Sequence, residues 1–124
     1  MADAIADYRS ALERLPSPDV YGARFVLEYG WARVLMTQHR WRDARVHWLN
    51  ALQSPTRRPT LLPLAYLHLA EAAKKEGDLR TMRRAAEGAI SADAVLGGRE
   101  GVLADVQALD PDGAWITPAA QAQQ

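Results

Sequence analysis

Two stretches of this 124-residue sequence carry the same pattern of small and large residues, 38 positions apart. Each stretch has apolar residues at helical spacing on both sides of a short polar break, residues 39–43 in the first and 76–79 in the second. The matching pairs are Ala32 and Ala70, Ala44 and Met82, Trp48 and Ala86, and Ala51 and Ala89. A period of this length predicts two copies of a helix–turn–helix unit arranged in tandem.

The pattern resembles the tetratricopeptide repeat, in which a small residue stands where the two helices of a unit cross closely. Ala32 and Ala70 occupy that position, whereas Met82 and Ala86 depart from the family, which has alanine and an aromatic residue there. The resemblance covers residues 25–58 and 63–96, and more weakly 4–16. It implies an all-α fold, a right-handed α-solenoid of antiparallel helix pairs with about six helices.

Residues that start and stop helices divide the chain further. The expected elements are a half-repeat at 2–16, helices at 18–38, 42–53, 60–76 and 79–92, a capping helix at 99–109 and a flexible tail at 114–124. Thr60 is expected to cap the fourth helix, Gly77 to adopt a left-handed conformation and Asp78 to open the fifth helix. Together these elements predict a single domain over residues 1–113.

Composition excludes several kinds of chemistry. The chain has no cysteine, and therefore no disulfide, thiolate nucleophile or cysteine metal site. It has no apolar run of about 20 residues that would span a membrane, and its first residues lack the order of a signal peptide. These observations predict a cytoplasmic protein that does not enter membranes.

The remaining chemical motifs are sparse. His39, His47 and His68 do not have the spacing of metal ligands, and we expect His47 to lie on the surface. No phosphate-binding glycine loop, nucleophile motif or catalytic carboxylate pair is present in the sequence. We therefore expect no enzyme activity, no metal and no cofactor.

Charge is unevenly distributed although the net charge is zero. Residues 24–58 contain seven arginines and two acids, whereas residues 85–124 contain one arginine and six acids. Arginines alternate with Trp41 in residues 40–45, which suggests nucleic-acid binding. The core spacing of Trp41 and Trp48 and the overall neutrality argue against it.

The resemblance implies that the first helix of each unit faces a concave groove that binds a partner. The implied contact residues are Tyr29, Arg33, Met36, His68, Glu71 and Lys75. Their mixture of apolar and charged side chains is typical of peptide binding. Chaperone-binding members have Lys and Asn at the positions of Tyr29 and Arg33, so their two-carboxylate clamp is not expected; a looser acidic ligand on Arg33, Lys74 and Lys75 stays open.

The sequence thus predicts an adaptor, chaperone or assembly subunit that binds another protein or peptide through this groove. Three alternatives stay open at this point. A terminal helix could fill the groove, the chain could be a non-catalytic subunit of an enzyme complex that binds through its terminal helices or convex face, or it could associate with nucleic acid. Self-association through an end helix is a further expectation.

Overall fold

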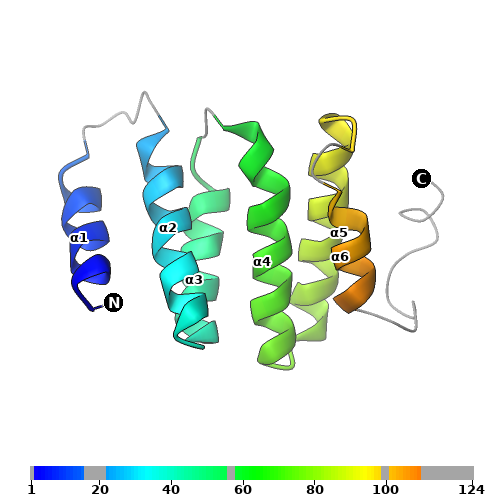
Figure 1. Cartoon of the computed structure of the whole chain (residues 1–124), viewed down its shortest axis with the longest axis horizontal. Coiled ribbons are helices and arrows are strands. Elements are labelled where there is room, and N and C mark those ends of the chain that lie inside the picture. Colours follow the sequence, from blue (N-terminus) through cyan, green and yellow to red (C-terminus); the bar gives the residue numbers. More distant parts are fainter. Residues whose placement is uncertain (1, 16–21, 56–57, 99–100, 110–124) are drawn as a thin grey trace. The chain divides into compact units, whose positions relative to one another are not determined.

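A computed structural model of the chain describes residues 2–15, 22–55, 58–98 and 101–109. Within these ranges it contains six α-helices, one short 3-10 helix and no strand, which confirms the all-α prediction (Figure 1). The elements are α1 (Ala2–Glu13), α2 (Ala23–Thr37), α3 (Trp41–Leu52), η1 (Pro59–Leu61), α4 (Leu62–Lys75), α5 (Leu79–Val95) and α6 (Val102–Leu109).

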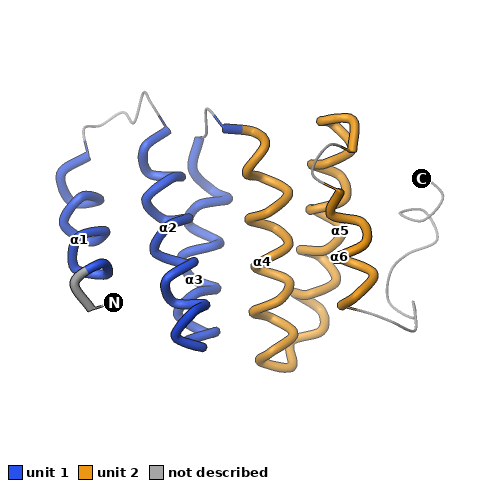
Figure 2. Tube along the Cα trace, in the orientation of Figure 1, with its two compact units in different colours: residues 1–58 blue, residues 59–124 orange. Residues whose placement is uncertain are grey.

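The chain divides into two compact units, unit 1 with residues 1–58 and unit 2 with residues 59–124 (Figure 2). In unit 1, α2 packs against α3 and α1 packs against α2. In unit 2, α4 packs against α5, and α6 contacts both of these helices. The single domain over residues 1–113 stays a prediction.

The two helix pairs turn through the same backbone hydrogen bonds. In unit 1 the amide of Arg40 donates to the carbonyl of Leu35 at 3.0 Å, and in unit 2 the amide of Asp78 donates to the carbonyl of Ala73 at 2.9 Å. A bond that spans six residues in this way closes the end of a helix by the Schellman motif. Because both bonds are displaced by 38 residues, the sequence offset is also an offset in backbone structure.

One residue in each turn adopts the left-handed conformation, but its identity differs. Gly77 has φ 76° as predicted, whereas the matching residue in unit 1 is His39 with φ 57°. Asp78 caps α5 as predicted, since its carboxylate accepts from the amide of Thr81 at 3.1 Å and from the Thr81 hydroxyl at 2.7 Å.

Three helices begin later than expected, namely α2, α4 and α6; α6 begins at Val102, and the expected start at residue 99 lies outside the described residues. α2 begins at Ala23, because the residue before it, Gly22, has the left-handed φ of 70°, and the expected start at residue 18 lies outside the described residues. Thr60 lies within η1 and does not cap α4, which begins at Leu62 with no side-chain cap. Pro63 stands in the first turn of α4, where proline is tolerated because the first amides of a helix need no intrahelical partner. The predicted tail at 114–124 also lies outside the described residues.

Small residues are buried where the helices pack. Ala32, Ala44 and Ala51 have no exposed surface, and the large Trp48 between them is also fully buried. In unit 2 the buried set includes Met82 and Ala86, the two departures from the family pattern. Alternation of large and small side chains fills such a core at high density.

A tyrosine ring covers a glycine in each unit. A Cβ atom added to Gly30 of α2 would lie 2.6 Å from the hydroxyl oxygen of Tyr8 in α1. A Cβ atom added to Gly88 of α5 would lie 2.6 Å from Cδ1 of Tyr66 in α4. Neither helix can therefore carry a larger residue at this point unless the ring moves.

We expect Gly77→Ala to lower the free energy of unfolding by about 1 kcal/mol, because a Cβ atom is strained in the left-handed conformation. The space around Gly77 is open, so a steric contact does not contribute to the loss. Urea denaturation, monitored by circular dichroism, measures this loss of stability. The matched change His39→Gly relieves the same strain in unit 1, and a loss of stability in that variant would contradict the interpretation.

We expect Gly88→Ala to lower the free energy of unfolding by about 1–2 kcal/mol, because overpacking against Tyr66 outweighs the better helix propensity of alanine. Ser91→Ala, at an exposed position of the same helix, is the control and should not destabilise the protein. In a Tyr66→Ala background the penalty of Gly88→Ala should disappear. A full penalty in that background would show that the ring is not its cause.

Candidate functional site

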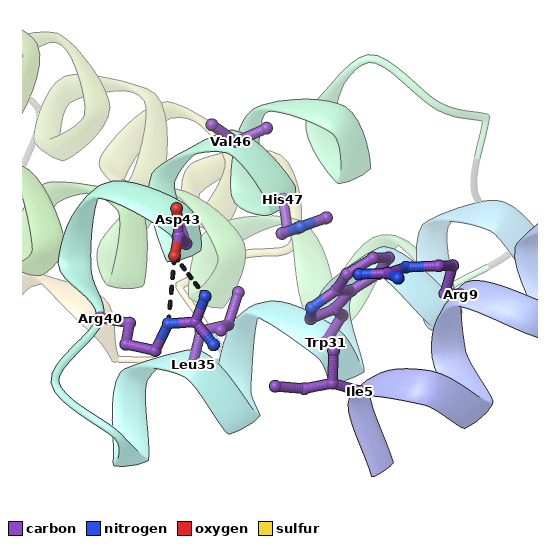
Figure 3. Close-up of a pocket in the computed structure, with 8 residues that line it drawn as sticks. All are labelled: Ile5, Arg9, Trp31, Leu35, Arg40, Asp43, Val46 and His47. Carbon is purple, nitrogen blue, oxygen red and sulfur yellow. Dashed lines mark hydrogen bonds and ion pairs between the residues drawn. The ribbon is translucent and has the colours of Figure 1, made fainter. Parts of the chain in front are cut away.

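An open hollow of about 290 Å³ lies in unit 1, lined by side chains from α1, α2, α3 and the turn before α3 (Figure 3). Its apolar lining is Ile5, Leu35 and Val46. Its aromatic and polar lining is Arg9, Trp31, Arg40, Asp43 and His47. The hollow thus combines an apolar wall with groups that can hold a charged or hydrogen-bonding ligand.

Side chains from α1 and from α3 both contact Trp31 of α2. The imidazole of His47 in α3 stacks on the indole with a centroid distance of 3.8 Å and an interplanar angle of 22°. The guanidinium carbon of Arg9 in α1 lies 5.8 Å from the indole centroid, within the range of a cation–π contact. Trp31 is itself only partly buried, so the indole forms part of the surface of the hollow.

Behind His47 lies a buried carboxylate. Glu28 of α2 is 4% exposed, and its Oε2 lies 2.6 Å from Nδ1 of His47. Asn50 Nδ2 donates a longer hydrogen bond of 3.5 Å to Oε1 of the same carboxylate. A buried carboxylate requires such partners, and an ionised one accepts a proton-bearing Nδ1. Nε2 is therefore the ring nitrogen of His47 that is left for a ligand.

The prediction that His47 lies on the surface was wrong, because its side chain is 15% exposed and joins α3 to α2. The spacing of His47 from the buried alanines of α3 could have predicted this burial. His47 lies three residues after Ala44 and four before Ala51, on the buried stripe of α3. Glu28 occupies the corresponding stripe of α2, three residues after Phe25, and sequence reasoning missed it.

The charges that line the hollow do not cancel. Arg40 forms an ion pair with Asp43, with Nη2 2.6 Å and Nε 3.1 Å from the same carboxylate oxygen. Both side chains are about half exposed, and such a pair contributes little to stability. Among the described residues, Arg9 has no recorded acidic partner, so its guanidinium is the cation of the lining that is left for a ligand.

Of the groove residues predicted in unit 1, Tyr29 is a core residue. Only 9% of it is exposed, and its ring meets that of Trp48 edge-on at a centroid distance of 5.0 Å and 87°. Tyr29 is buried because it lies on the same helical stripe as Phe25 and Ala32. The prediction of a groove position did not take this spacing into account. Arg33 is exposed and Met36 is half-buried.

In unit 2 the structure brings two of the predicted residues together. Nδ1 of His68 lies 2.9 Å from Oε1 of Glu71, and both side chains are roughly one-third exposed. Lys75 is exposed. Lys74, which the sequence offers as a holder of acidic ligands, instead donates to the carbonyl of Leu109 at 2.8 Å.

We expect His47→Ala to lower the free energy of unfolding by about 3 kcal/mol, because it leaves the carboxylate of Glu28 buried beside only a weak partner. The double variant Glu28→Leu with His47→Ala should recover much of that loss, because it removes the buried charge. Urea denaturation of the single and double variants measures the coupling. Additive losses would mean that the two side chains do not interact.

Two features are absent from the described residues. No group of three His, Asp or Glu side chains is arranged to hold a metal ion, and no helix is long and apolar enough to cross a membrane. The sequence matches no protein-family model, and no curated protein or solved structure shows significant similarity to it.

Proposed function

We propose that this protein is a protein-binding module built from two tandem tetratricopeptide-like helix pairs in a right-handed α-solenoid. The observation that supports this proposal is the recurrence of the turn hydrogen bond after 38 residues, from Arg40 and Leu35 to Asp78 and Ala73. Tandem helix pairs stack side by side and present extended surfaces, which proteins of this kind use to bind other proteins.

The contact residues that we propose come from one helix of each pair, and each helix contributes its own surface. They are Arg33 and Met36 of α2 and His68, Glu71 and Lys75 of α4, without the buried Tyr29. All five side chains are exposed or half-buried. Apolar Met36 supplies contact area, and the charged side chains orient a partner segment. In this proposal the protein works as an adaptor, chaperone or assembly subunit, without catalysis or a cofactor.

The test is affinity capture from a lysate of the source organism with the wild-type protein and the triple variant Arg33→Ala, Met36→Ala, Lys75→Ala. We expect mass spectrometry to find a protein that the wild type retains and the variant loses, because the variant lacks two charges and the apolar contact. The matched control is Leu79→Ala, Arg80→Ala, Arg84→Ala, which removes one apolar and two charged side chains that are exposed on α5.

The control variant distinguishes an interface on α2 and α4 from one on α5. A partner that only the control variant loses would contradict the α2 and α4 surfaces and place the interface on α5. A partner that both variants retain would exclude all of these surfaces. Capture that disappears after nuclease treatment and falls steeply with salt would instead indicate nucleic acid.

A further inference from the structure

We infer that the hollow of unit 1 binds an acidic side chain of a partner peptide, with the carboxylate on Arg9 and the peptide backbone at His47. This inference rests on the proposed function, because it specifies the chemistry of a segment that the module would bind. The site is nevertheless separate in its residues from the α2 and α4 surfaces, since none of those five residues lines the hollow.

Arg9 is suited to hold the carboxylate. Its guanidinium lies over Trp31 at the hollow, and no acidic partner is recorded for it within the described part of the chain. A guanidinium bonds a carboxylate through two parallel N–H donors, which gives both charge compensation and direction. The contact with the indole holds the guanidinium near one position before the ligand arrives, which reduces the ordering cost of binding.

The charge of the lining favours a monovalent group. The ion pair between Arg40 and Asp43 is neutral as a whole, so Arg9 supplies the cation for a ligand, while the buried Glu28 carboxylate lies behind His47. One carboxylate neutralises the charge of Arg9, whereas a phosphate dianion would add a second negative charge near Asp43. The hollow therefore suits an aspartate or glutamate side chain better than a phosphorylated one.

His47 favours a peptide over a free small acid. Glu28 occupies Nδ1 of His47, which leaves Nε2 for a ligand, as an acceptor in the neutral imidazole and as a donor in the protonated one, with no recorded partner among the described residues. A peptide backbone offers a partner to either form, an amide that donates or a carbonyl that accepts. The buried Glu28 and the stacked Trp31 fix the plane of the imidazole, so the hydrogen bond of Nε2 has a defined direction.

The apolar wall explains how neighbouring side chains of the peptide would be held. Ile5 and Val46, which is 51% exposed, line the hollow together with the buried Leu35, which is 1% exposed. Leu49, one turn further along α3, is 42% exposed and extends the apolar surface beyond the hollow. A volume of about 290 Å³ suits one or two side chains rather than a whole helix. The predicted ligand is therefore a short segment with apolar residues beside the acid.

The test uses two matched probes, acetyl-Leu-Glu-Leu-amide and acetyl-Leu-Gln-Leu-amide, which differ only in the charged group. Each is titrated into the ¹⁵N-labelled protein, and the indole N–H resonance of Trp31, assigned with Trp31→Phe, reports binding by nuclear magnetic resonance. We expect the glutamate peptide to bind about tenfold more tightly than the glutamine peptide, because only it forms the charge-assisted bond. Arg9→Gln should abolish that difference.

The control variant is Arg14→Gln, which removes the same charge from an exposed residue directly after α1 that does not line the hollow. It should keep the tenfold preference. Equal affinity for the two peptides, an unchanged preference in Arg9→Gln, or no shift with either peptide would each overturn the inference. Circular dichroism of both variants verifies that the helices are retained.

The peptide titration tests the acidic site, and the affinity capture tests the proposed function, so each can fail without the other. If the peptides fail while the α2 and α4 variant loses its protein partner, the proposed function stands and only the acidic site is wrong. If the peptides bind as expected while that variant keeps every partner, the proposed surfaces are wrong and the hollow is the binding site.

Discussion

The close packing of α2 against α3 is the constraint on which the rest of unit 1 depends. A connection of three residues joins the helices, and alanines at 32, 44 and 51 allow their backbones to approach. The large Trp48 then fills the space that the small residues leave, with Tyr29 edge-on to it. A bulkier residue at any of the alanine positions would separate the helices and expose this core to water.

That packing also creates a polar contact inside the pair. Glu28 and His47 come from different helices and meet at 2.6 Å only because α2 and α3 are closely packed. A buried ion or hydrogen-bonded pair of this kind contributes less to stability than an apolar pair of the same size. The Glu28–His47 contact also determines part of the surface. It holds the imidazole against Trp31, and both rings line the hollow together with Arg9.

The two units share a turn but differ in charge and in their additional helices. Unit 1 contains nine arginines and six acids, whereas unit 2 contains six basic residues and nine acids. In unit 2 the buried Asp93 accepts from the amide of Val102 at 3.3 Å, and Lys74 bonds the carbonyl of Leu109, so both ends of α6 are held. Acidic side chains at the start of a helix and basic ones at its end are favoured by the helix dipole. In unit 2, the charged Asp93 and Lys74 thus hold the two ends of α6. In unit 1, Arg9 lines the hollow instead.

The sequence by itself determined the helical character, the 38-residue offset and the turn at Gly77 and Asp78, because helical periodicity, small-residue spacing and capping preferences act over a few neighbouring residues. It also contained the stripes on which Tyr29, Glu28 and His47 lie, but the resemblance placed Tyr29 in a groove, His47 was expected on the surface and Glu28 was missed. Only the tertiary structure decided that Glu28 meets His47, that Tyr8 covers Gly30 and that Arg9 lies over Trp31. These contacts join residues about 20 positions apart on different helices, and their formation depends on how the helices are rotated and packed, which no local preference specifies.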